Sequence, residues 1–86
     1  MSRYTVVSIP EAEAELATIW MGETDRDRVS AAANSADRLL GENPLQDSVE
    51  LSEQLRRRDF PPLRFYFEIR EEDRIVVISS ISRLAD

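Results

Sequence analysis

The sequence contains no cysteine, no histidine and no lysine, so all 11 of its basic side chains are arginines. Without cysteine there is no disulfide framework, no thiolate zinc site and no thiol nucleophile. Without histidine there is no Ser-His-Asp triad, and without lysine there is neither a Schiff base nor the lysine of a P-loop. Any chemistry performed by this chain therefore depends on carboxylates, arginines, hydroxyls or backbone groups.

The chain is also short, and it lacks long hydrophobic runs. By the usual size prior its 86 residues make one domain, which we assign to residues 1–86. No apolar run approaches the roughly 18 residues that a membrane span requires. The N-terminus has no hydrophobic stretch typical of a signal peptide. We therefore expect a cytoplasmic protein that has no membrane partner.

The formal net charge of -6 is unevenly distributed along the chain. Residues 1–53 hold 4 arginines and 11 acidic residues, whereas residues 54–86 hold 7 arginines and 6 acidic residues. A negative surface repels nucleic-acid phosphates, which argues against free nucleic-acid binding by the whole molecule. The C-terminal part can nevertheless present a local basic patch.

A first helix is predicted to begin after Ser8, which stands before Pro10 in a sequence typical of a capping box. Apolar residues then recur at helical spacing until Gly22. Trp20 belongs to this stripe, which favours a place in the core over a surface that faces a partner protein. We expect the glutamates of the first turns to serve in capping and solvation, and they are Glu11, Glu13 and Glu15.

A second, longer helix is predicted with Thr24 as its N-cap and Gly41 as the residue just after its end. Its apolar stripe is rich in alanine, which permits a close approach to the first helix. Asn43-Pro44 confirms the stop. Because the link between the two helices is short, the sequence predicts an antiparallel helical hairpin.

Four strands are predicted from β-forming residues and from alternation of apolar and polar side chains. They cover residues 3–8, 55–60, 63–69 and 74–81. The link from Leu45 to Glu53 is interpreted either as a further turn of helix or as an irregular crossing. The expected fold class is α+β, in the order β-α-α-β-β-β, with a helical hairpin packed on one face of a small, mostly antiparallel four-stranded sheet.

This order of elements resembles the RelE/ParE toxin superfamily of type II toxin–antitoxin systems, which includes proteins described as plasmid stabilisation proteins. The resemblance covers nearly the whole chain. It rests on the following segments: Tyr4-Thr5-Val6-Val7, Pro10, Ala12-Glu13-Ala14-Glu15-Leu16, Ile19-Trp20, Ala32-Ala33, Asp37-Arg38-Leu39-Leu40, Asn43-Pro44, Pro62-Leu63-Arg64-Phe65-Tyr66-Phe67-Glu68-Ile69, Asp73-Arg74 and Ile75-Val76-Val77.

The resemblance implies a small bacterial toxin that is neutralised by a cognate antitoxin protein made from the neighbouring gene. RelE-like members cut messenger RNA at the ribosome, and ParE-like members poison DNA gyrase. The resemblance therefore implies either DNA gyrase or the ribosome with its mRNA as a second partner. We expect no small-molecule cofactor and no metal.

The resemblance also carries over candidate catalytic residues, which apply only if the chain is an RNase. Arg64 matches the family's arginine at the start of the third strand, Arg56 and Arg58 lie in the basic second-strand region, and Arg83 lies near the basic position after the last strand. Strand alternation puts Arg56 and Arg58 on one face. Such arginines would stabilise the charge on the reacting phosphate, and an aromatic residue would stack on a base.

The sequence departs from the RNase pattern in two places. The second-strand lysines of the family are absent, and Leu84 and Ala85 stand where RNase members carry a basic and aromatic segment. We therefore expect a ParE-like toxin that binds a macromolecular target, with DNA gyrase as the candidate, rather than an enzyme. Two alternatives stay open: a RelE-like endoribonuclease, and a degenerate family member without toxicity, which the acidic net charge suggests.

Each candidate residue also has a purely structural interpretation. Arg64 would pair with a carboxylate, either one on a neighbouring strand or Glu68 further along the same face, and Tyr66 would pack across strands. The run from Arg56 to Arg58 would be a solvated edge strand that discourages aggregation. The acidic cluster at residues 71–73 lies in a predicted turn, where such clusters rarely bind a metal without further ligands.

Overall fold

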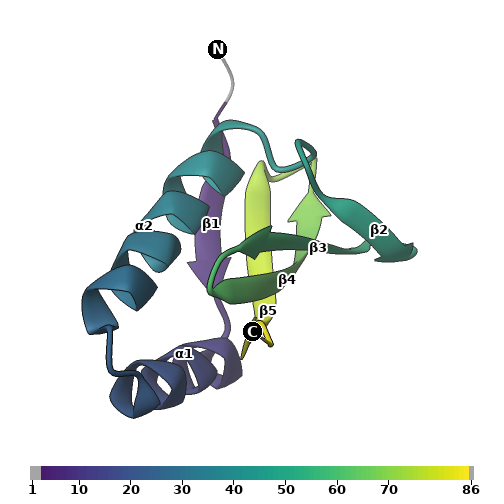
Figure 1. Cartoon of the computed structure of the whole chain (residues 1–86). Helices are drawn as coiled ribbons and strands as arrows, with labels where there is room; N and C mark the ends of the chain where they lie inside the picture. Colours follow the sequence, from purple (N-terminus) through teal and green to yellow (C-terminus); the bar gives the residue numbers. More distant parts are fainter. Residues whose placement is uncertain (1–2, 86) are drawn as a thin grey trace.

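The computed structural model describes residues 3–85, which form two helices and one mixed sheet (Figure 1). The sheet has the order β1-β5-β4-β3-β2, in which β1 runs parallel to β5 and the other neighbours are antiparallel. In chain order the elements are β1 (Thr5–Ser8), α1 (Pro10–Gly22), α2 (Arg26–Glu42), β2 (Val49–Ser52), β3 (Leu55–Phe60), β4 (Leu63–Arg70) and β5 (Ile75–Arg83).

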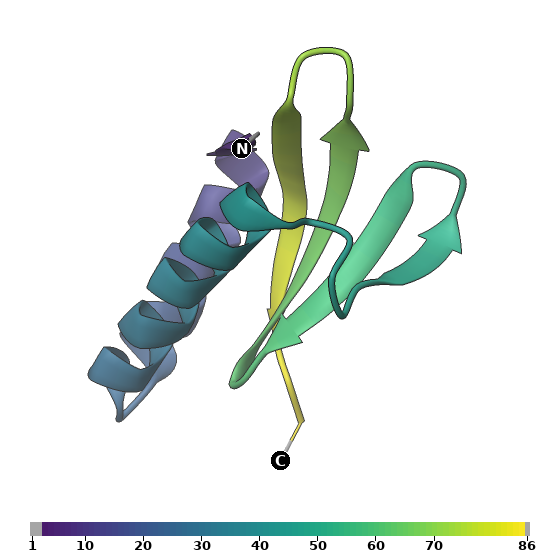
Figure 2. The ribbon, with the colours of Figure 1, turned by 90° about the horizontal axis from the view of Figure 1, so that it is seen from above.

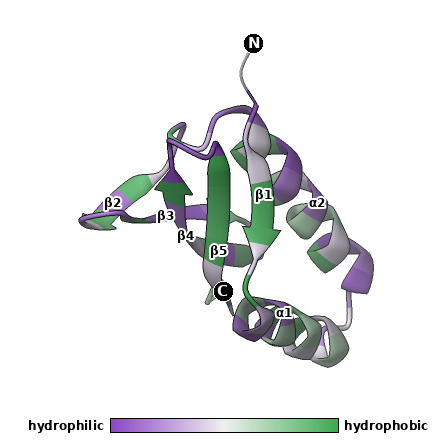
Figure 3. Ribbon diagram, turned by 180° about the vertical axis from the view of Figure 1, so that it is seen from behind, coloured by the Kyte–Doolittle hydropathy of each residue, from purple (hydrophilic) through white to green (hydrophobic). Residues whose placement is uncertain are grey.

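Both helices lie on the same side of the sheet, so the core is a single layer between helices and strands (Figure 2). In β4 the alternation of apolar and polar residues matches their burial. Phe65 and Phe67 are buried, whereas Arg64 and Tyr66 are half-buried on the other face. Figure 3 shows β5 as largely hydrophobic and β3 as hydrophilic. The α+β fold with a helical hairpin on one face of the sheet is thus confirmed.

The sheet has five strands rather than the expected four, because Val49–Ser52 forms β2 and pairs with β3. Neither a helical turn nor an irregular crossing describes these residues. All four residues are exposed. The segment therefore lacks the alternation of buried apolar and exposed polar residues by which a strand is recognised in a sequence. Its backbone is held by the ladder to β3, and it forms the edge of the sheet farthest from the helices (Figure 2).

Both helices begin one residue later than the sequence predicts. Ser8 belongs to β1, where it lies opposite Ile78, and Ile9 occupies the N-cap position of α1 without a side-chain cap. For α2 the cap is Asp25 rather than Thr24, because the Asp25 Oδ1 accepts a hydrogen bond from the backbone N–H of Arg28 at 3.1 Å. Pairing with β5 thus removes Ser8 from the cap of α1, whereas at α2 the local hydrogen bond to Arg28 identifies Asp25 as the cap.

Gly41 lies inside α2, which extends to Glu42, and so it is not the residue after the helix end. The Gly41 carbonyl oxygen accepts a hydrogen bond from the Tyr4 N–H at 2.8 Å. A Cβ atom at this position would stand 3.3 Å from the Tyr4 carbonyl oxygen and 3.2 Å from Arg3 Nη2. The glycine therefore permits the close approach of the chain that enters β1.

Trp20 is not a core residue. Its side chain is 39% exposed on the outer side of the helical hairpin, next to the more exposed Met21. The buried residues that the helices contribute to the core are instead small or aliphatic, among them Ala12 of α1 and Val29 of α2. Helical spacing identifies the stripe to which a residue belongs, but a hairpin has an inner and an outer apolar stripe.

Glu15 has a structural role that capping and solvation do not describe. From the exposed side of α1 its carboxylate reaches β5, where it accepts the Ile81 N–H at 3.0 Å and the Ser80 hydroxyl at 3.3 Å. The β4–β5 register shifts just before this point, between Tyr66 and Phe67. Glu15 thus ties α1 to the sheet where the ladder is irregular.

Candidate functional site

The arginine that the sequence favours most, Arg64, lies on the sheet face that the helices leave uncovered, which we call the open face. Residues directly opposite on neighbouring strands point to the same face. The β3–β4 register pairs Arg64 with Asp59 and Tyr66 with Arg57, so these four side chains share the open face. We call them the open-face cluster.

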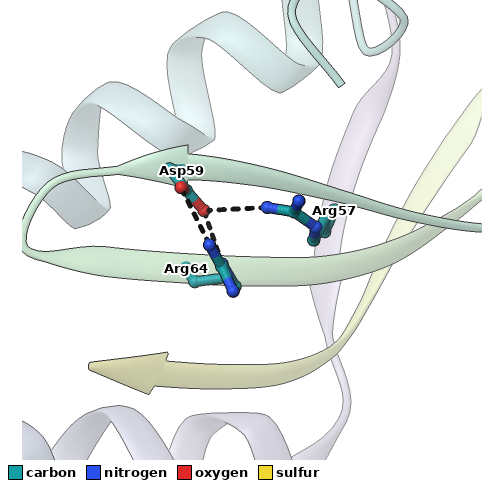
Figure 4. Close-up of polar contacts among 3 residues, drawn as sticks. All are labelled: Arg57, Asp59 and Arg64. Carbon is teal, nitrogen blue, oxygen red and sulfur yellow. Dashed lines mark hydrogen bonds and ion pairs between the residues drawn. The ribbon is translucent and has the colours of Figure 1, made fainter. Parts of the chain in front are cut away.

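Asp59 stands between the two arginines of the cluster (Figure 4). Its Oδ1 is 2.7 Å from Arg64 Nε and its Oδ2 is 3.2 Å from Arg64 Nη2, which is a two-point contact of a guanidinium with a carboxylate. Arg57 Nη1 lies 3.8 Å from the same Oδ1. One carboxylate is therefore shared by two guanidinium groups, and the three charged groups together keep a formal charge of +1.

The electrostatics of the pair follow from this geometry. The hydrogen bond from Arg64 is the main cause that holds the pKa of Asp59 below its ordinary value, and the opposing effect of burial is smaller. In return, the pKa of Arg64 is raised, first by the hydrogen bond to Asp59 and next by that to Tyr66. A phosphate group that approached Arg64 would find its Nε and Nη2 donors already occupied by Asp59.

Arg56 and Arg58 share one face, as predicted, but it is the face opposite to Arg64, because the β3–β4 register places them across from Phe67 and Phe65. Arg56 donates from Nε to the Ser48 hydroxyl at 2.8 Å and from Nη2 to the Ser48 carbonyl oxygen at 3.4 Å. It thereby fastens the link between α2 and β2.

Arg58 is nine-tenths buried, with its guanidinium 4.5 Å from the centroid of the Phe60 ring and its Nη2 3.9 Å from Asp47. Since β2 covers β3, the expectation that Arg56 to Arg58 form a solvated edge strand is wrong. Both Arg56 and Arg58 hold the chain that leads into β2.

Arg83 ends β5 and makes a hydrogen-bonded ion pair with Glu23, the residue that follows α1. It also donates from Nη1 to the Leu84 carbonyl oxygen at 2.7 Å. The four predicted site residues are therefore not assembled into one site. The residue that does join Arg64 is Arg57. The signal for it was present, since the two-residue turn Pro61-Pro62 fixes Phe60 opposite Leu63 and so Arg57 opposite Tyr66.

The open-face pair predicts a pH dependence of stability. Because the pKa of Asp59 is lowered in the folded chain, the stabilisation from the pair is complete above the ordinary pKa of 3.8 and is lost as the pH falls through the lowered value. The variant Asp59→Asn should therefore unfold at lower urea than the parent at pH 7, and the two midpoints should converge in strong acid. A gap that stays constant between pH 7 and pH 2 would contradict this.

Within residues 3–85, no three acidic side chains are placed to hold a metal ion, and neither helix has the length and hydrophobicity needed to cross a membrane.

No protein-family model and no curated protein sequence matches the chain. Solved structures do. The chain is similar to one in the crystal structure of the toxin–antitoxin complex RelBE2 from Mycobacterium tuberculosis, with a TM-score of 0.83 and 22% identity over 100% of this chain and 97% of that one. It is also similar to a chain of the archaeal RelE–RelB complex from Pyrococcus horikoshii OT3, with a TM-score of 0.71 and 12% identity over 93% of both chains.

In each comparison the similarity extends over nearly the full length of this chain and of the matched chain. It therefore includes the helical hairpin as well as the sheet. The chain shares the RelE-like fold of these structures, which is the fold that its sequence pattern predicts. At these identities the likeness concerns the fold alone.

Proposed function

We propose that this protein is the toxin component of a type II toxin–antitoxin system and that a cognate antitoxin protein neutralises it. The observation that carries the proposal is the full-length similarity to a chain of the RelBE2 toxin–antitoxin complex, at a TM-score of 0.83. Similarity of fold does not by itself transfer an activity, so the choice of mechanism depends on the candidate residues.

The toxin acts in the cytoplasm by binding a macromolecular target, in the manner of ParE-like proteins, with DNA gyrase as the candidate target. RNA cleavage through the 2′-hydroxyl needs a proton acceptor, positive charge at the phosphate and an acid for the leaving group. The separation of Arg56, Arg58 and Arg83 from Arg64 supports binding over cleavage. So does the contact of Asp59 with Arg64, which engages the donors that a phosphate would use.

One observation favours the alternative of a RelE-like endoribonuclease. Arg57, Arg64 and Tyr66 lie together on the open face, which places two cations beside an aromatic ring. An RNA strand that displaced Asp59 would meet both guanidinium groups, and a base would find the ring of Tyr66 to stack on.

The proposal is tested by inducing the gene alone and together with its neighbouring gene. Growth arrest in the first case and relief in the second are expected. Two assays then separate the mechanisms, one on purified gyrase and the other on RNA from the arrested cells. Inhibited supercoiling by purified gyrase is expected for the binding toxin, and new 5′ ends in translated messages, seen by primer extension, are expected for the endoribonuclease. Growth without arrest would indicate a degenerate member that has lost toxicity.

A further inference from the structure

The open-face cluster holds one carboxylate between two arginines, and the place of that carboxylate decides what else the arginines can bind. Asp59 Oδ1 lies 2.7 Å from Arg64 Nε and 3.8 Å from Arg57 Nη1 (Figure 4). An anion that is to contact both guanidinium groups at once needs the position that this oxygen occupies. The bridging position of the cluster is therefore filled by a side chain of the protein itself.

Asp59 contacts Arg64 in the way that a phosphate group would. Its two oxygens lie 2.7 and 3.2 Å from Arg64 Nε and Nη2, and a guanidinium makes this two-point contact with phosphates as well as with carboxylates. Asp59 and a nucleic-acid phosphate therefore compete for the same donors. The β3–β4 register holds Asp59 directly opposite Arg64, whereas a phosphate has to arrive from solution, so the carboxylate has the advantage of an intramolecular partner.

The charge balance of the cluster depends on Asp59. Within the described part of the chain, the ion pairs of Arg57 and Arg64 both go to this residue. Glu68, the other acidic residue of β3, β4 and β5, pairs instead with Arg70 at 4.0 Å. Replacement of the Asp59 carboxylate by a neutral group therefore vacates the bridging position and raises the formal charge of the cluster from +1 to +2.

The contact between Asp59 and Arg64 is accessible to solvent. The side chain of Arg64 is 31% exposed and that of Asp59 is 36% exposed. An ion pair with this exposure is screened by salt and adds little to stability, so it can open while the sheet stays folded. A phosphate that meets the open face therefore has to displace Asp59 but does not have to unfold the sheet.

We propose that Asp59 is a specificity-determining residue that keeps the open face from binding the phosphates of single-stranded nucleic acid. In the native chain its carboxylate occupies the position between Arg57 and Arg64. Without the carboxylate the two arginines bind the phosphate backbone, and Tyr66, which lies opposite Arg57, offers its ring to a base. This role goes beyond the proposed function, since it requires neither a particular target nor toxicity.

The experiment compares the full chain with its Asp59→Asn variant, in which the side chain keeps its size and loses its charge. The probe is a fluorescent oligouridine of about 12 nucleotides, and fluorescence anisotropy at low salt measures its dissociation constant. The variant should bind about tenfold more tightly than the parent, as expected when a competitor that fills the site about nine-tenths of the time is removed. Its affinity should also fall more steeply with salt, by about 1.4 in the logarithmic slope for two phosphate contacts of a single strand.

Matched variants separate the loss of this carboxylate from a general change in charge. Asp37→Asn makes the same change at an exposed position of α2, on the other side of the sheet, and should bind like the parent. Asp59→Glu keeps a carboxylate and should also bind like the parent. Added to Asp59→Asn, Arg64→Gln should abolish the gain, whereas Arg38→Gln at an exposed position of α2 should retain it. Circular dichroism checks that each variant is folded.

Asp59→Ala should show the same gain, so the test does not depend on one variant, and an abasic oligonucleotide of the same length should gain as much as the oligouridine. Three results would overturn the proposal: a parent that binds as tightly as Asp59→Asn, an equal gain in Asp37→Asn, or a gain that survives Arg64→Gln. A gain confined to the oligouridine would assign the effect to base stacking and overturn it as well. The growth experiment on the proposed function uses no oligonucleotide, so the two hypotheses can fail separately.

Discussion

Phe67→Ala is expected to lower the free energy of unfolding by about 3 to 5 kcal/mol, the range observed when a buried phenylalanine is truncated. Phe67 is fully buried in β4, between β3 on one side and β5 on the other, and it faces the helices. The neighbouring strands and helices can close only partly around the lost ring, so a cavity remains. In a chain of this size such a loss is a large part of the total stability.

Tyr66→Ala is the matched control for this prediction, because Tyr66 is the preceding residue of the same strand and points to the open face. It removes a ring of similar size from a half-buried position, so the loss should be clearly smaller. Urea unfolding followed by circular dichroism measures both variants. Equal losses would contradict the assignment of one buried and one open face to the sheet.

Glu15→Ala is expected to destabilise the chain by about 1 to 3 kcal/mol, the usual cost of leaving a partly buried donor without its partner. The donor is the Ile81 N–H, which lies beside the register shift of the β4–β5 ladder and donates to the Glu15 carboxylate. The loss of this contact also frees the Ser80 hydroxyl, so α1 loses a polar tie to β5.

Glu11→Ala serves as the control for Glu15→Ala, since Glu11 is an exposed glutamate one turn earlier in α1. Its replacement should change the free energy of unfolding by no more than about 0.5 kcal/mol, as is usual at exposed positions. Amide hydrogen exchange adds a local readout, in which the Ile81 N–H should exchange faster in the Glu15 variant alone. Similar effects of the two variants would contradict a role of Glu15 in holding α1 to β5 and would leave it a role in capping and solvation.

The parts of the fold that sequence could predict are those where buried positions recur as a regular pattern of apolar residues. The strand expected at Leu55–Phe60 has the same bounds in the structure, and β4 alternates between buried and half-buried residues along its length. β2 could not be recognised, because all of its residues are exposed and its backbone is held by the ladder to β3. Trp20 is exposed rather than buried, because periodicity cannot distinguish the sheet-facing stripe of a helix from an apolar stripe on its outer side.

The candidate site was less predictable than the fold, because it depends on register. Strand alternation placed Arg56 and Arg58 together but gave no relation to Arg64, which lies on another strand and proves to face the other way. The sequence predicts that Arg64 pairs with a carboxylate but does not identify the residue, and the structure shows that it is Asp59 on the neighbouring strand. The ion pair of Arg83 with Glu23 joins residues that are far apart in the sequence, and no local sequence pattern predicts such a contact.

The most direct test of the account is the growth of cells in which this chain is induced alone, compared with cells that also express the neighbouring gene. If the protein is a toxin that acts by binding, growth should stop in the first culture and be normal in the second, and no new 5′ ends should arise in translated messages. Undiminished growth of the first culture would contradict a toxin, and arrest accompanied by cleaved messages would contradict a toxin that acts by binding.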